Sequence, residues 1–92
     1  MSILVTMQVG PVDWDKFRAA AKWLNTLPSP GLLSTRAWQA EDDPNTVLVE
    51  QEWESHQAFH AVADRFGAEF NRRAGTAELN WVDRVWKPAS ID

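Results

Sequence analysis

Residues 46–59, TVLVEQEWESHQAF, contain a strand pattern that leads directly into the start of a helix. Apolar and polar side chains alternate through residues 46–54, and this period of two with β-branched residues predicts a strand. Ser55 comes next, and serine is favoured just before a helix because its hydroxyl accepts an otherwise free backbone N–H. One face of the predicted strand carries Val47, Val49, Gln51 and Trp53. The stretch therefore predicts a strand over residues 46–54 and a helix that begins after Ser55.

The helix after Ser55 has an apolar stripe at helical spacing, which predicts one buried side. This stripe consists of Phe59, Val62, Ala63, Phe66 and Phe70. Gly67 lies within the stretch and costs about 1 kcal/mol relative to alanine in a helix, so we expect a weak point or a break there. Gly75 predicts the end of the helix, because glycine readily adopts the left-handed conformation that terminates many helices.

Two more strands are predicted before this unit. Residues 32–40 alternate in polarity and are separated from residues 46–54 by the acidic turn EDDPN, so the two strands should form a hairpin. Residues 3–9 also alternate, and Gly10-Pro11 ends that strand because proline cannot continue a hydrogen-bonded ladder.

A helix is predicted between the first two strands. Asp13 is the expected N-cap, and the sequence PSPG at residues 28–31 ends the helix. Its apolar stripe consists of Trp14, Phe17, Ala20, Ala21, Leu24 and Leu27. Trp23 lies about 110° from the centre of this stripe and is expected on its flank.

A last strand is predicted over residues 78–86, before Pro88. One face of this strand carries Leu79, Trp81, Asp83 and Val85. The element order β-α-β-β-α-β then predicts an α+β fold of the ferredoxin-like type, with two helices on one face of an antiparallel four-stranded sheet. The opposite face also carries apolar and aromatic side chains. A second copy of the chain is the simplest cover for it, so we expect a twofold homodimer.

Composition narrows the class of protein. The chain has 92 residues, no cysteine, six tryptophans and a net charge of −4. Its length predicts a single domain over residues 1–92, with no disulfide or thiolate zinc site to support the core. The negative charge without a basic block argues against nucleic-acid and membrane-surface binding. No long apolar run or signal-peptide pattern is present, so we expect a cytoplasmic protein.

Three stretches resemble the antibiotic biosynthesis monooxygenase family: GLLSTR at residues 31–36, DDPN at residues 42–45 and VLVEQEWESHQAF at residues 47–59. The last stretch matches best, because the family often has an acidic strand ending in Trp, then Glu-Ser and a helix beginning with an Ala-Phe or Ala-Leu pair. The resemblance implies a dimeric α+β barrel with the helices outside and one pocket per subunit between helices and sheet. Some members oxygenate polycyclic aromatic phenols without metal or flavin, whereas others degrade haem or are isomerases, so fold alone does not assign the reaction.

The resemblance places Trp53 at the strand-end tryptophan that quinone-forming members hold in the pocket. In that subgroup an asparagine precedes the tryptophan by four residues, and here this position is Val49. The alternative for Trp53 is a core residue that fills the gap between sheet and helices. Haem-degrading members use an asparagine on the first strand and a histidine on the second helix. The first strand here has no asparagine, and the nearest helix positions are Val62 and Phe70, so we expect no haem.

The two histidines lie on the second predicted helix. His56, His60 and Asp64 recur every four residues, a spacing that can align metal ligands. Helical geometry turns this row from the edge of the apolar stripe into solvent, so we predict no metal site. His60 is the best candidate for a proton acceptor at a pocket rim, and the alternative is an exposed helical histidine.

Cationic and aromatic side chains together could bind an acidic aromatic ligand by stacking or cation–π contact. The alternative for the strand arginines, Arg36 and Arg84, is ion pairing with Glu50 or Glu52 on a neighbouring strand or across the dimer. The predicted ligand-binding residues are Trp23, Arg36, Trp38, Val49, Phe66 and Trp81.

These patterns and the resemblance lead to a functional hypothesis. We predict a cofactor-independent monooxygenase that acts on an aromatic, polyketide-like small molecule, with Trp53 as a pocket wall and His60 as the base. The expected partners are a second copy of the chain and a small apolar or aromatic ligand. One alternative is a non-catalytic dimer that binds a small ligand, or whose pocket is filled by Trp23, Trp53 and Phe66. Another is an isomerase of a small lactone or signal molecule.

Overall fold

The computed structural model describes residues 2–91, in which four strands and two helices follow the predicted order. The elements are β1 (Ile3–Val9), α1 (Trp14–Leu24), β2 (Leu32–Gln39), β3 (Val47–Trp53), α2 (His56–Ala74) and β4 (Val82–Trp86). The ferredoxin-like α+β class is therefore confirmed. A single domain over residues 1–92 stays a prediction, since its two end positions lie outside the described residues.

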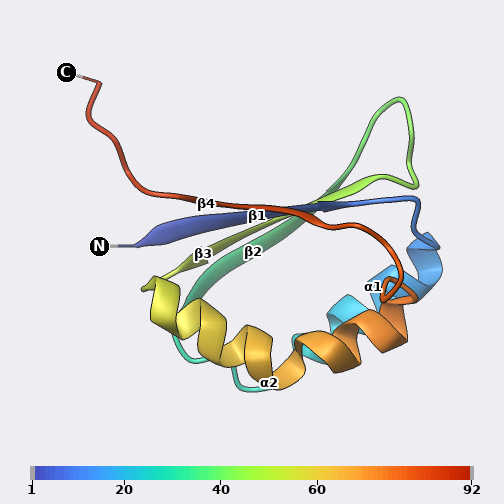
Figure 1. Cartoon of the computed structure of the whole chain (residues 1–92), viewed down its shortest axis with the longest axis horizontal. Helices are drawn as coiled ribbons and strands as arrows, with labels where there is room; N and C mark the ends of the chain where they lie inside the picture. The colour runs from blue at the N-terminus through green and yellow to red at the C-terminus, as the bar shows by residue number, and fades with distance from the viewer. Residues whose placement is uncertain (1, 92) are drawn as a thin grey trace.

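The four strands form one antiparallel sheet in the order β2-β3-β1-β4. Both helices lie on the same side of this sheet, and the other side has no helix against it (Figure 1). The predicted hairpin of β2 and β3 is present, with Ala37 opposite Val49 and Thr35 opposite Gln51. Side chains therefore divide between a helix-facing side and an open side of the sheet.

The predicted helix ends are formed by the expected residues. The Asp13 side chain accepts the backbone N–H of Lys16 at 3.2 Å, and the Ser55 hydroxyl accepts that of Ala58 at 3.0 Å. Each bond satisfies a donor that the helix itself leaves free. At the other end of α2, Gly75 has φ 73°, a left-handed conformation that a side chain would disfavour.

Three details of the sequence prediction were wrong. Helix α1 ends at Leu24, because Leu27 lies in a turn where its N–H bonds to the Leu24 carbonyl at 3.0 Å. Helix α2 continues through Gly67 without a break. Strand β4 begins at Val82, not at residue 78, because the chain first turns at Thr76, whose carbonyl accepts the N–H of Leu79 at 3.1 Å. Trp81 therefore lies in the loop that leads into β4.

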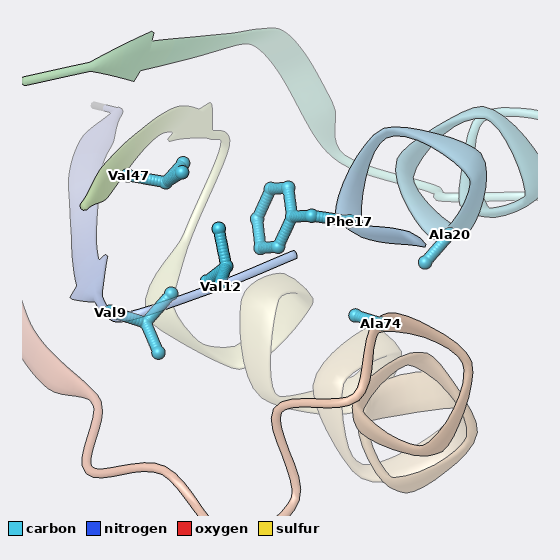
Figure 2. Packing of buried hydrophobic residues seen from close by; sticks show 6 residues of the cluster. All are labelled: Val9, Val12, Phe17, Ala20, Val47 and Ala74. Atoms are coloured by element: carbon cyan, nitrogen blue, oxygen red, sulfur yellow. The ribbon is translucent and has the colours of Figure 1, made fainter. Parts of the chain in front are cut away.

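The buried core lies at one end of the space between sheet and helices. It consists of Val9, Val12, Phe17, Ala20, Val47 and Ala74 (Figure 2). Phe17 is 1% exposed and contacts the ring of Phe70 edge-on, with 5.5 Å between the ring centroids. Burial of one such aromatic side chain contributes roughly 1.5–3 kcal/mol to the free energy of folding. Thr76, the buried polar residue beside this core, donates from its hydroxyl to the Asn71 side chain at 2.8 Å.

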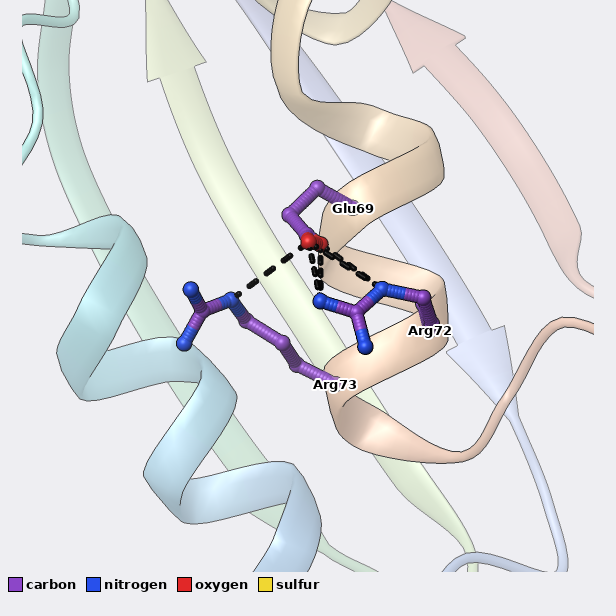
Figure 3. A network of polar contacts seen from close by, with 3 residues as sticks. All are labelled: Glu69, Arg72 and Arg73. Atoms are coloured by element: carbon purple, nitrogen blue, oxygen red, sulfur yellow. Dashed lines mark hydrogen bonds and ion pairs between the residues drawn. The ribbon is translucent and has the colours of Figure 1, made fainter.

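A charged cluster on the outer side of α2 contacts α1 through Arg73. The Arg72 guanidinium donates to both carboxylate oxygens of Glu69, and Arg73 lies 3.9 Å from the same carboxylate (Figure 3). Arg73 also lies over the ring of Trp23 on α1, with its Cζ 4.2 Å from the ring centroid. The hydrogen bonds from Arg72 lower the pKa of Glu69 against a partial desolvation, and the charges of Arg72 and Arg73 lower it further.

No helix within residues 2–91 is long and apolar enough to cross a lipid bilayer.

Substitution of Glu69 by glutamine should lower the melting temperature at neutral pH. A depressed folded pKa adds stability above the ordinary pKa of glutamate, and this stability is lost as the pH falls through the folded value. The difference between Glu69→Gln and wild type should therefore shrink at pH ~3 and in high salt. Thermal unfolding at both pH values measures it, with exposed Glu78→Gln as the control. An equal difference at both pH values would contradict this role of the cluster.

Candidate functional site

A cavity of about 550 Å³ lies between the sheet and the two helices, a size typical of small-molecule sites. All four strands and both helices contribute to its lining. The two helices pack closely on each other, whereas the backbone of α2 approaches the sheet closely at few points. Side chains therefore leave part of the space between the helices and the sheet unfilled, and this space is the cavity.

The floor of the cavity follows the register of the sheet. Ala37, Val49, Met7 and Asp83 stand opposite one another across β2, β3, β1 and β4, and all four line the cavity. This row is apolar across three strands and ends on a carboxylate at edge strand β4. The neighbouring row adds polar groups, with Thr35 on β2 opposite Gln51 on β3.

Aromatic side chains form the walls. Trp53 is 2% exposed, lines the cavity and meets Phe59 of α2 with 5.8 Å between ring centroids. Its indole N–H donates to the Gln51 side chain at 3.1 Å, which fixes the orientation of both groups. Trp53 is thus both a buried residue of the sheet–helix layer and a wall of the cavity. A second aromatic group, Phe17, Phe70 and Trp81, lies where the cavity meets the closed core.

Two polar features at this second group stand out. Partial desolvation raises the pKa of the Asp83 carboxyl above its ordinary range. The indole Nε1 of Trp81 is buried and has no hydrogen-bond partner among the described residues. A buried donor without a partner costs about 1–3 kcal/mol.

Five of the eight predicted site residues line this one cavity: Trp53, Arg36, Val49, Phe66 and Trp81. Trp23, Trp38 and His60 are not part of the lining. Trp23 lies between the helices, edge-on to Phe66 at 6.4 Å and beneath Arg73. Trp38 lies on the open side of the sheet, where its indole donates to Glu50.

The histidines form a pair on the outer side of α2. The Nε2 atoms of His56 and His60 are 3.0 Å apart, and both side chains are exposed. Within residues 2–91, no group of three or more His, Cys, Asp or Glu side chains is arranged to hold a metal ion. A catalytic role for His60 stays a prediction, and its neighbour Phe59 rather than His60 reaches the cavity.

Sequence reasoning missed Asp83 as a site residue. Its signal was present, because Asp83 is the one acidic residue on a strand face that otherwise carries Leu79, Trp81 and Val85. A charged side chain on the helix-facing side of a strand is a candidate for a functional site, although here the residue is exposed at the sheet edge.

The comparisons with known proteins agree on the fold. A protein from Methanosarcina mazei Go1 has a TM-score of 0.77 at 18% identity, over 97% of this chain and 94% of that chain. SnoaB from Streptomyces nogalater, described as a cofactor-independent oxygenase, has in a mutant form a TM-score of 0.74 at 15% identity, over 97% of this chain and 94% of its own. A Bordetella bronchiseptica protein named after antibiotic biosynthesis monooxygenases has a TM-score of 0.76 at 12% identity, over 98% and 100%.

At these identities the solved structures establish the fold alone. No curated protein sequence matches the chain at a significant level. The family model described as antibiotic biosynthesis monooxygenase matches residues 1–66, which run from β1 into α2 and include the Trp53–Phe59 stretch. Since this match spans well over half of the chain, the protein belongs to the antibiotic biosynthesis monooxygenase family.

Proposed function

We propose that the protein is a cofactor-independent monooxygenase that oxygenates an electron-rich, polyketide-like aromatic molecule in the cavity between sheet and helices. The observation that carries this proposal is the open, aromatic-walled cavity of about 550 Å³ with a few polar groups at its margins. Membership in the family and the fold shared with SnoaB, a cofactor-independent oxygenase, support the reaction class.

The chemistry needs a substrate that can become electron-rich by losing a proton. An aromatic ring that enters the cavity would lie against Trp53 and the rings of α2 and would displace water from them. Loss of a proton from a phenol or its keto form leaves an anion that transfers electrons to O₂ directly. The apolar floor formed by Met7 and Val49 fits a flat ring and holds no polar group that would compete for the anion.

The same floor supports the second candidate, a dimer that binds a small ligand without turning it over. Val49 occupies the position where quinone-forming relatives carry an asparagine, so the middle of the cavity has no polar group to hold oxygen. A pocket closed by its own side chains is not favoured, because Trp23 lies outside the lining and leaves the cavity open. The other alternative, an isomerase of a small lactone or signal molecule, would need a proton acceptor at the cavity but no oxygen.

We also infer that a second copy of the chain covers the open side of the sheet. That side carries Trp38 at 49%, Trp86 at 46% and Val82 at 62% exposure. Exposed tryptophans on one sheet face are typical of interfaces between subunits. In this arrangement the helices stay outside and each subunit keeps its own cavity. A cytoplasmic location stays a prediction from the sequence.

Filling the cavity should lower activity. With a panel of anthrones and polycyclic phenols, wild-type protein should consume oxygen faster than the uncatalysed reaction. Ala63→Trp should lower kcat/KM by at least about tenfold, because the new indole occupies the volume that the ligand needs. Ala68→Trp is the matched control on the exposed side of the same helix. Absence of turnover across the panel, with retained binding by tryptophan fluorescence, would favour the binding protein over the oxygenase.

A charge on the open side of the sheet should separate the subunits. Wild type should sediment at twice 10.5 kDa at micromolar concentration. Trp38→Glu, which places a second carboxylate beside Glu50, should weaken the dimer by at least about a hundredfold in Kd. Ala68→Glu on the outer side of α2 should leave the mass unchanged. A monomeric wild type would overturn the inference.

A further inference from the structure

Asp83 occupies one end of the row of residues that crosses the cavity floor. The row runs Ala37, Val49, Met7, Asp83, one residue from each strand. With strands about 4.8 Å apart, it spans about 14 Å from β2 to β4. A flat ring system laid across Val49 and Met7 therefore brings one edge to the Asp83 carboxylate.

Asp83 is the only carboxylate among the described residues that line the cavity, and no histidine lines it. The other polar lining residues carry hydroxyls, amides or indole N–H groups, and none of these accepts a proton readily near neutral pH. Arg36 also belongs to the lining, but its guanidinium lies over the ring of Trp38 on the open side of the sheet. Asp83 is exposed at the sheet edge, and partial desolvation still raises the pKa of its carboxyl, which makes the carboxylate a stronger base.

Trp81 completes this end of the cavity. It precedes Asp83 by two residues, and its ring contacts Phe17 and Phe70 at 6.3 Å each between centroids. Its buried N–H lacks a partner among the described residues. The end of the row thus combines a proton acceptor with an aromatic wall, which suits a flat substrate that carries an acidic hydrogen.

We propose that Asp83 is the catalytic base, and that it takes a proton from a weakly acidic, anthrone-like aromatic substrate lying across the floor of the cavity. This inference rests on the proposed function and adds the residue that removes the proton.

The step balances without a bound cofactor. The Asp83 carboxylate takes one hydrogen of the ring CH₂ as a proton, and the electron pair of that C–H bond delocalises onto the ketone oxygen as an enolate. The enolate carbon then forms a C–O bond with O₂, and the proton returns from Asp83 to the distal oxygen to give a hydroperoxide. Loss of the second hydrogen and cleavage of the O–O bond release water and leave a quinone carbonyl. O₂ is the oxidant and the substrate is the sole reductant.

Deuterium exchange separates proton removal from oxygenation. Without oxygen and in D₂O, wild type should accelerate exchange of the anthrone CH₂ protons, measured by NMR. Asp83→Asn should lower this acceleration by about a hundredfold or more, because a general base typically contributes that much. Asp83→Glu should retain part of it. Asp64→Asn, an exposed acid of α2 outside the lining, is the matched control and should match wild type.

The possible outcomes divide the two proposals. If deuterium exchange depends on Asp83 but no oxygen is consumed, the assignment of Asp83 as the base is supported and the proposed oxygenase function is overturned. If Asp83→Asn leaves oxygen uptake unchanged, the oxygenase function is supported and the assignment of Asp83 as the base is overturned. Failure of wild type to accelerate exchange would also overturn that assignment. In wild type kcat/KM should fall as the pH drops through the pKa of Asp83, and this acid limb should be absent from the residual activity of Asp83→Asn.

The same variant should be more stable than wild type at neutral pH. An acid whose folded pKa is raised destabilises the fold when ionised, and this penalty disappears as the pH falls through that pKa. Asp83→Asn should therefore raise the melting temperature at neutral pH and not at pH ~3. A lower melting temperature at neutral pH would show that Asp83 serves the fold and would overturn its assignment as a base held for catalysis.

Discussion

The rest of the structure depends on the distance between the helix pair and the sheet. At one end Phe17 and its apolar neighbours close the layer completely. Toward the other end, Trp53 of the sheet contacts Phe59 of α2. The cavity lies between this contact and the closed core. Aromatic rings are suited to this task because they are rigid and large, so a few of them hold two layers apart without filling the volume between them. The cavity is a direct result of where the rings stand.

Much of the fold follows from local patterns that act over a few residues. Alternation in β1 and β3, the caps at Asp13 and Ser55, and the terminating Gly75 are short-range effects, and the structure has each of them. The errors arise where tertiary contacts outweigh local pattern. The segment before β4 alternates as a strand does, but packing of Leu79 and Trp81 on the core holds it as a loop.

The site was only partly accessible from the sequence. Trp53, Val49 and Phe66 could be placed because they lie on stripes whose direction the periodicity indicates. Trp23 could not, since a residue on the flank of a helix faces either the cavity or a neighbouring helix, and only the crossing of α1 and α2 decides between them. Asp83 was missed for a related reason. Its place on the floor depends on the pairing of β4 with β1, which joins residues far apart in the chain.

The closed core and the open cavity occupy different ends of one small layer. Core residues such as Val9, Val47 and Ala74 lie outside the cavity lining, while Ala63, Val62 and Thr35 line the cavity without belonging to the core cluster. Substitutions among the cavity residues should change which ligand shapes fit, with little loss of folding stability. In most small proteins each inward residue both stabilises the fold and shapes the site. Such separation makes a chain of this size evolvable. The same scaffold can exchange one substrate for another through single mutations without crossing an unstable intermediate sequence.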